Sequence, residues 1–288
     1  MEIIHTRNSK ELAKSLAKEL SFPIFSANVR RFNNDEISVS VPKRFHDVIV
    51  VASTVANEDW IELFLLLDAL RDSKNLTLCV SYMGYSRQDT QNPNESFGAD
   101  LFPRLLENMN IFRCIILDNH GEPRIRIPTI HVSPEKAFIS DITSKYNSDK
   151  IVIVSPDIGG AYRAGSIAKA MGCNFAICNK VRDVFGELKK TDVIGDVKDK
   201  ICVLVDDIVD SGATLCRAAD SLSKHGCDGI VAYCTHGILS KGSVPKLEKS
   251  NIAEIILTDS IACPNELSQK FRKLSIASLI AEAIRCIL

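Results

Sequence analysis

The sequence predicts an α/β fold of two domains, each built on a mainly parallel sheet flanked by helices. Short apolar runs rich in β-branched residues recur along the 288 residues, and stretches with the apolar spacing of a helix lie between many of them. Strands that alternate with helices form parallel sheets, which bind ligands at the carboxyl ends of their strands. A polar stretch at residues 141–150 separates two such series, so we expect domains at residues 1–145 and 146–288.

The expected strands are short apolar runs rich in residues that favour β-structure. They are residues 48–52, 76–80, 114–117, 151–154, 175–178, 201–205, 230–233 and 254–257.

The expected helices begin and end at capping residues. Asn8 and Glu11 resemble a capping box for the first helix. A Ser-Pro-Glu sequence at residues 133–135 has the residue types that begin another. Further helices are expected at residues 60–70, at residues 213–225 before Gly226, and in the last stretch, 274–284, which we expect to pack back on the first domain.

The composition indicates a soluble globular protein. The formal net charge is -1, so no broad positive field exists to attract nucleic acid or a membrane surface. No apolar run reaches membrane-spanning length, and residues 1–20 lack the apolar core of a signal peptide. The ten cysteines form no C-x-x-C pair, which favours reduced core thiols over a metal site. We therefore expect a cytoplasmic protein with neither a nucleic-acid nor a membrane partner.

The strongest functional signal is the stretch of residues 201–214, in which an apolar strand leads to two acids and then to a small-residue turn that opens a helix. Carboxylates suit the vicinal hydroxyls of a ribose and also attract Mg²⁺. Backbone N–H groups at a helix N-terminus favour a phosphate, and a glycine lets the chain approach it closely. The alternative is an ordinary strand-to-helix turn with a capping acid. The candidate ribose-phosphate residues are Asp206, Asp207, Asp210, Ser211, Gly212, Ala213 and Thr214.

This loop resembles the phosphoribosyl-diphosphate-binding motif of type I phosphoribosyltransferases and of ribose-phosphate diphosphokinases. The rest of the chain favours the second family, because further segments resemble it in the same order and cover nearly the whole length. These segments are residues 31–39, 85–89, 118–120, 155–160, 180–182, 235–237 and 274–284.

The resemblance implies two similar phosphoribosyltransferase-type domains with the active site between them. It implies a transferase of nucleotide biosynthesis in which the anomeric hydroxyl of ribose 5-phosphate attacks the β-phosphorus of ATP. The products are 5-phosphoribosyl 1-diphosphate and AMP, and Mg²⁺ is the cofactor. The family also implies a homo-oligomer built from dimers, up to a hexamer, in which adenine contacts cross a subunit boundary.

The resemblance assigns roles to individual residues. Lys180 and Arg182 would be the cations of a closing loop that stabilise the transferring group, with His120 as a further catalytic residue. His120 and Asp157 would contact the metal. The residues assigned to ATP are Phe32, Asn34, Glu36, Arg87, Gln88 and Asp89. The alternatives are a surface hairpin at residues 32–36, a solvated basic loop at 180–182, and a structural histidine.

Three departures from the family lie on the ATP side. Residues 90–95 lack the basic residue that commonly follows Asp89, the segment 121–126 is compressed, and Asn119 stands where an apolar or small residue is usual. Arg124 or Arg126 is a candidate to restore the missing cation. The departures suggest the hypothesis that the enzyme binds ATP weakly or prefers another nucleoside triphosphate.

Two other functions remain open on the sequence alone. One is a non-catalytic regulatory paralogue, although such a subunit need not keep the acidic and cationic set together. The other is a type I phosphoribosyltransferase, which would need a base-binding hood and no ATP.

Overall fold

The computed structural model describes residues 1–122, 124–182, 188–264 and 267–288. The chain divides into two compact units: unit 1 contains residues 1–134, 259–262 and 275–288, and unit 2 contains residues 135–258 and 263–274. The expected boundary after residue 145 differs from this division, because helix α4 (Glu135–Lys145) lies between the two positions. Phe138 and Ile142 of α4 pack in a core of unit 2, so the helix belongs there.

Unit 1 is built on a parallel sheet of six strands in the order β2-β1-β5-β6-β7-β8. The expected strands at 48–52, 76–80 and 114–117 are confirmed inside β5, β6 and β7. The other three strands are short and were not expected. The strands are β1 (Glu2–His5), β2 (Ile24–Ser26), β5 (Asp47–Ser53), β6 (Asn75–Tyr82), β7 (Arg113–Leu117) and β8 (Thr129–Val132).

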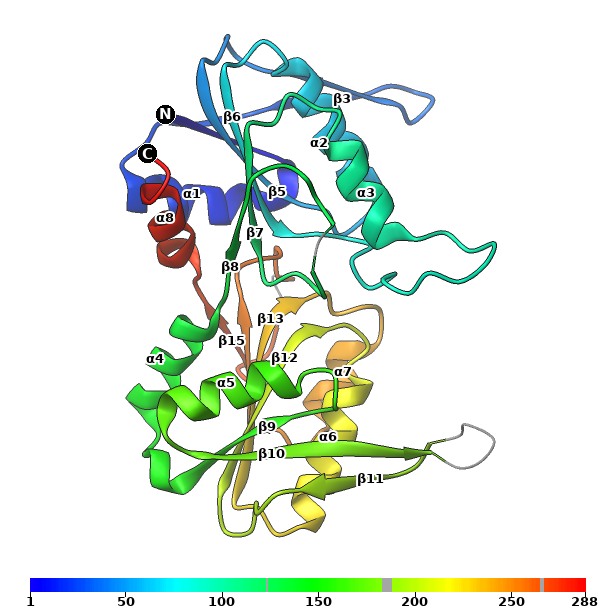
Figure 1. Cartoon of the computed structure of the whole chain (residues 1–288), viewed down its shortest axis with the longest axis vertical. Helices are drawn as coiled ribbons and strands as arrows, with labels where there is room; N and C mark the ends of the chain where they lie inside the picture. The colour runs from blue at the N-terminus through cyan, green and yellow to red at the C-terminus, as the bar shows by residue number, and fades with distance from the viewer. Residues whose placement is uncertain (123, 183–187, 265–266) are drawn as a thin grey trace. The chain divides into compact units, whose positions relative to one another are not determined.

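Helices cover both faces of this sheet (Figure 1). Helices α1 (Lys10–Leu20) and α8 (Ala277–Arg285) pack side by side on one face, and α2 (Asn57–Ala69) and α3 (Gly98–Leu106) pack on the other. A hairpin of β3 (Asn28–Arg31) and β4 (Ile37–Ser40) forms a separate two-stranded sheet.

The expected capping box at the first helix is wrong. A 3-10 turn, η1 (Arg7–Ser9), precedes α1, and Ser9 is the N-cap without a capping side-chain hydrogen bond. The amide of Asn8 instead donates to Asp59 of α2, which lies far away in the sequence.

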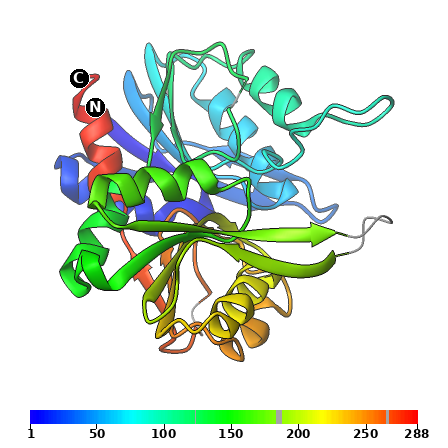
Figure 2. The same cartoon turned by 60° about the horizontal axis from the view of Figure 1, so that its bottom comes forward.

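Unit 2 is built on seven strands in the order β11-β10-β9-β12-β13-β14-β15. All neighbours are parallel except β10 and β11, which run antiparallel side by side (Figure 2). The five expected strands of this half are confirmed inside β9, β10, β12, β13 and β14. The bounds are β9 (Ile151–Ser155), β10 (Asn174–Arg182), β11 (Leu188–Ile194), β12 (Ile201–Val209), β13 (Gly229–Gly237), β14 (Glu254–Thr258) and β15 (Phe271–Leu274).

The helices of unit 2 complete a second three-layer arrangement. Helices α4 and α5 (Ala161–Met171) pack on one face of the sheet, and α6 (Ala213–Lys224) and α7 (Ser243–Glu248) pack on the other. A 3-10 turn, η2 (Ser148–Lys150), leads from α4 into β9. Within the described part of the chain, no helix is both long and apolar enough to cross a membrane.

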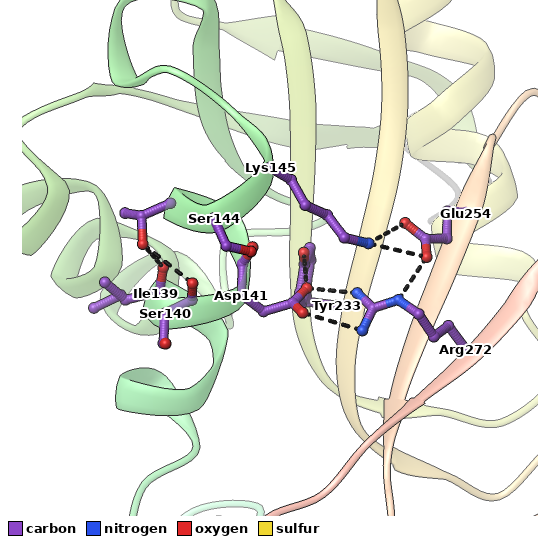
Figure 3. Close-up of polar contacts among 9 residues, drawn as sticks. Ile139, Ser140, Asp141, Ser144, Lys145, Tyr233, Glu254 and Arg272 are labelled. Carbon is purple, nitrogen blue, oxygen red and sulfur yellow. Dashed lines mark hydrogen bonds and ion pairs between the residues drawn. The ribbon is translucent and has the colours of Figure 1, made fainter.

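Polar contacts tie α4 to the edge of the sheet (Figure 3). Asp141 of α4 accepts hydrogen bonds from Arg272 of β15 and from the hydroxyl of Tyr233 on β13. Arg272 also donates to Glu254 of β14, which pairs with Lys145. We call these five residues the Arg272 network.

Candidate active site

The predicted ribose-phosphate loop follows β12 and opens α6. Gly212 is the N-cap of α6 and has a φ of +71°, in the left-handed region that glycine adopts without strain. A Cβ at this position would lie 2.8 Å from Cγ of Leu247 in α7. The N–H of Ala213 donates to the hydroxyl of Ser211 over 3.4 Å. The turn is therefore compact and specifically requires glycine.

The two acids of the loop lie next to each other near the end of β12. The N–H of Asp207 donates to Oδ1 of Asp206 over 3.0 Å. Burial raises the pKa of Asp206 well above its usual value, and the neighbouring carboxylates of Asp207 and Asp157 raise it further. Three carboxyl groups therefore lie near one another in this part of unit 2, and such groups suit cations and sugar hydroxyls.

Asp157 follows β9, the parallel neighbour of β12. Its backbone carbonyl accepts a hydrogen bond from the hydroxyl of Ser155 over 2.6 Å, and its carboxylate accepts one from the N–H of Gly160 over 3.3 Å. A Cβ at Gly160 would lie 2.9 Å from Oγ of Ser155. These contacts hold Asp157 at the same edge of the sheet as Asp206. The structure therefore brings Asp157, the predicted metal contact, close to Asp206 of the predicted ribose-phosphate loop.

A cation that sequence reasoning missed also lies at this edge. Nη2 of Arg163, in the first turn of α5, lies 3.8 Å from Oδ2 of Asp207, and both side chains are mostly buried. The signal was available in part, since an arginine follows closely after the Gly159-Gly160 turn. Its partner on β12 is distant in the sequence, so only the tertiary fold identifies the pair.

Lys180 and Arg182 lie in the last residues of β10. Their backbone pairs with Thr191 and Leu188 of β11, respectively. Their side chains lie outside the described part of the structure, and so do residues 183–187.

In unit 1, the turn that carries Arg87, Gln88 and Asp89 follows β6. The N–H of Gln88 donates to the carbonyl of Tyr85 over 3.0 Å, and the carbonyl of Gln88 accepts from Ala99 in α3 over 3.1 Å. The ring of Tyr85 stacks on Phe102 of α3 at a centroid distance of 4.3 Å. The start of α3 therefore holds the turn in place. The side chains of Arg87, Gln88 and Asp89 on this turn are exposed.

The loop of His120 follows β7 and reaches the same turn. The amide of Asn119 donates to the carbonyls of His120 and Gly121 over 3.1 Å each. A Cβ on Gly121 would lie 3.9 Å from the carboxylate of Asp89. Asn119, which departs from the family pattern, thus ties the compressed loop together beside the Arg87 turn.

Phe32, Asn34 and Glu36 lie on the connection between β3 and β4. The N–H of Phe32 donates to the carbonyl of Glu36 over 2.8 Å, and the N–H of Glu36 donates to Oδ1 of Asn34 over 3.3 Å. The ring of Phe32 is 43% exposed. Cζ of Arg30 lies over this ring, 5.3 Å from its centroid. A partly exposed ring can stack on a flat ligand, although the surface-hairpin alternative predicts the same geometry.

The donor groups fit Mg²⁺ by their chemistry. Magnesium takes one or two carboxylates and completes its shell with waters and substrate phosphates rather than an all-protein cage. Asp157, Asp206 and Asp207 offer such oxygens at one edge of the unit 2 sheet, where burial and the two neighbouring carboxylates raise the pKa of Asp206. No group of three or more histidine, cysteine or acidic side chains that could hold a metal occurs among residues 1–122, 124–182, 188–264 and 267–288.

Comparisons with known proteins give consistent matches along the chain. A model described as the N-terminal domain of ribose phosphate pyrophosphokinase matches residues 1–109, and one described as the phosphoribosyl synthetase-associated domain matches residues 184–288. The ribose-phosphate pyrophosphokinase of Agrobacterium fabrum is 37% identical over 296 residues, covering 99% of this chain and 96% of the relative. That of Brucella melitensis is 38% identical with the same coverage.

A solved structure is similar over the full length. The crystal structure of phosphoribosylpyrophosphate synthetase from Mycobacterium smegmatis matches with a TM-score of 0.91 and 29% sequence identity. The match covers 99% of this chain and 98% of that chain. The similarity therefore extends through both units.

Proposed function

The chain belongs to the ribose-phosphate pyrophosphokinase family, and from this premise we propose how its residues carry out the reaction. The enzyme transfers the diphosphoryl group of ATP to the anomeric hydroxyl of ribose 5-phosphate, giving 5-phosphoribosyl 1-diphosphate and AMP. The observation that carries the assignment of residues is the acid pair of β12, Asp206 and Asp207, followed by the glycine turn that opens α6. The predicted family and two-unit α/β fold are thereby confirmed.

The sugar phosphate would bind on unit 2. The turn of residues 211–214 would hold the 5-phosphate on its backbone N–H groups and hydroxyls, where the dipole of α6 favours an anion. Asp206, Asp207 and Asp210 would accept hydrogen bonds from ribose hydroxyls. The position of Gly212 supports this role, because its left-handed φ and its closeness to Leu247 require a glycine at the start of α6.

ATP would bind through the polar groups of unit 1. Arg87 and Gln88 would contact the phosphates, with Asp89 shaping the turn, because a guanidinium and an amide both donate to phosphate oxygens. Phe32 would stack on adenine, and Asn34 and Glu36 would form hydrogen bonds with the edge of the base.

This adenine site would include contacts from a second subunit of a homo-oligomer built from dimers. Light scattering coupled to size-exclusion chromatography tests the oligomer, and a monomer at all concentrations would remove the cross-subunit adenine site.

Diphosphoryl transfer depends on positioning and charge neutralisation more than on a protein nucleophile. Lys180 and Arg182 would stabilise the charge on the transferring group. His120 and Asp157 would hold Mg²⁺ together with ATP oxygens, and the bound ion would neutralise negative charge on those phosphates.

The cytoplasmic location remains a prediction from composition.

Phosphorus NMR of purified protein with ribose 5-phosphate, ATP and Mg²⁺ tests the proposal. The expected result is one AMP for each sugar 1-diphosphate formed. A type I phosphoribosyltransferase would leave ATP intact and consume the sugar diphosphate only when a base is present. A regulatory paralogue would bind the ligands without turnover. Omission of Mg²⁺ and its restoration test the cofactor in the same experiment.

A further inference from the structure

The phosphate-binding turn of unit 1 is poor in positive charge. Between Arg87 and the first residue of α3, residues 88–97 include two acids, Asp89 and Glu95, and contain no lysine or arginine. A nucleoside triphosphate is a polyanion, and its binding in water depends on cations that replace its counterions and hydration. The turn alone therefore provides one guanidinium for a ligand that carries several charges.

The structure places a second guanidinium at this turn. The Cζ atom of Arg124, in the compressed loop after His120, lies 4.9 Å from the centroid of the Phe97 ring. Phe97 is the N-cap of α3 and directly precedes Gly98, whose Cβ position lies 2.9 Å from Oε1 of Gln88. The stacking therefore holds Arg124 beside the segment that carries Gln88.

The other end of the same short loop reaches the turn independently. Gly121 approaches the carboxylate of Asp89, with 3.9 Å between that carboxylate and the Cβ position of the glycine. Arg124 follows three residues later. Two contacts, one at Gly121 and one at Arg124, thus place the loop against the Arg87 turn and its continuation into α3.

Arg126 provides an internal comparison because it lies on the same loop and is also exposed. Its backbone N–H donates to the carboxylate of Glu107 over 2.7 Å, and Glu107 is the C-cap of α3. Ile125, between the two arginines, packs against the core. The side chain of Arg124 thus contacts the N-cap of α3, whereas the backbone of Arg126 contacts its C-cap.

We propose that Arg124 is a second triphosphate-binding cation of the ATP site, held on the face of Phe97 and acting beside Arg87. Stacking uses the flat face of the guanidinium, and its N–H groups at the edge remain directed outward for bidentate contact with phosphate oxygens. The inference rests on the proposed function, and it replaces the hypothesis that the missing basic residue simply weakens ATP binding.

The role is in binding rather than in the transition state. Arg124→Ala should raise the KM for ATP about tenfold, the effect of losing one charge-assisted contact. The kcat and the KM for ribose 5-phosphate should stay within about twofold of the wild type, because a contact made equally in the ground state and the transition state affects affinity alone. Arg124→Lys should recover part of the loss, since an ammonium keeps the charge without the planar fork.

The matched control is Arg126→Ala, which removes the same charge from the same loop and should leave the KM for ATP unchanged. Calorimetry of wild type and Arg124→Ala with ATP and with adenosine locates the contact. The dissociation constant for ATP should rise and that for adenosine should not, as expected for a phosphate contact. An unchanged midpoint of thermal unfolding without ligand shows that the variant is folded.

The outcomes separate the two proposals. No AMP formation by the wild type overturns the proposed function. Wild-type turnover with the same KM for ATP in Arg124→Ala overturns the role of Arg124 alone, and so does an equal effect of Arg126→Ala, because overall loop charge would then explain both. A parallel rise for adenosine would also overturn it, since the contact would not be with phosphate.

Discussion

Nη2 of Arg163 lies 3.8 Å from Oδ2 of Asp207, so the first turn of α5 provides a cation to the acid pair of β12. The exposed fractions of the two side chains are 19% and 14%, and the pair is therefore shielded from much of the solvent. Asp207 also raises the pKa of Asp206, so Arg163 approaches an acid that lies beside a second carboxyl group. We interpret Arg163 as a residue that positions Asp207 for the sugar.

Replacement of Arg163 tests this interpretation. Arg163→Gln should raise the KM for ribose 5-phosphate by about tenfold, because the orientation of Asp207 loses a partly buried charged contact. Arg163→Lys should retain more of the affinity. Steady-state kinetics measure both, and Lys169→Gln is the control because it removes an exposed charge from the far end of the same helix. Equal effects of the glutamine variants at positions 163 and 169 would refute the positioning role.

The sequence predicts the strands that are buried inside the two sheets, because these strands are rich in apolar residues. All eight expected strands lie inside their sheets and are mostly apolar, so tertiary information is not needed to recognise them. Strands β1, β2 and β8 contain three or four residues each, too few for a period to be visible. The domain boundary was displaced because the helical pattern of α4 does not indicate which core receives Phe138.

Site residues were predictable where a local motif carries them. The acids and glycine of residues 206–212 lie at the end of β12 and in the turn that follows it, and Gly212 has the left-handed φ that this turn requires. Arg163 and the stacking of Arg124 on Phe97 depend on pairs distant in sequence. The capping box at Asn8 failed for the same reason, since its side chain has a tertiary partner in Asp59.

Replacement of Gly212 should lower the stability of the protein and weaken its binding of the sugar phosphate. Gly212→Ala forces a left-handed residue, which costs about 1–2 kcal/mol, and brings its Cβ against Leu247. We expect a lower free energy of unfolding and a higher KM for ribose 5-phosphate, with the KM for ATP unchanged. Urea unfolding and steady-state kinetics measure the two effects.

A second glycine gives the control for this substitution. Gly165 lies inside α5, and a Cβ there would meet nothing within 4 Å. Gly165→Ala should stabilise the protein by about 0.5–1 kcal/mol, because alanine loses less backbone entropy in a helix. A Gly212→Ala variant as stable as Gly165→Ala would show that the left-handed turn is not needed.

Lys180 should matter for turnover and not for folding. If it stabilises the transferring group, Lys180→Ala lowers kcat by about 10²-fold or more, as loss of a transition-state contact does. The control is Lys190→Ala, which removes the same charge from the neighbouring strand. Lys190 of β11 pairs with Val181 of β10, the residue after Lys180. Single-turnover kinetics measure the chemical step. A small and equal decrease in both variants would favour the solvated basic loop over a catalytic cation.

The Arg272 network should contribute stability to unit 2 that depends on pH. Desolvation raises the pKa of Asp141, but hydrogen bonds from Arg272 and Tyr233 lower it more, so the pKa is below its usual value. The pKa of Glu254 is lowered in the same way, with desolvation outweighed by Arg272 and Lys145. A depressed carboxyl pKa gives stability that is present above the unfolded value, about 4, and is lost as the pH falls through the folded value.

Arg272→Met should therefore destabilise unit 2 at pH 7 by about 2 kcal/mol, since two partly buried carboxylates lose their shared cation. Hydrogen exchange of the amides in β14 and β15 measures the opening free energy in that unit. Lys273→Met is the control, because it removes an exposed cation from the neighbouring position of β15. Below about pH 4 the difference between wild type and Arg272→Met should shrink, as Asp141 and Glu254 become protonated in both proteins. A difference that stays constant down to pH 3 would mean that Arg272 stabilises the sheet edge by packing its aliphatic stem and not by its charge.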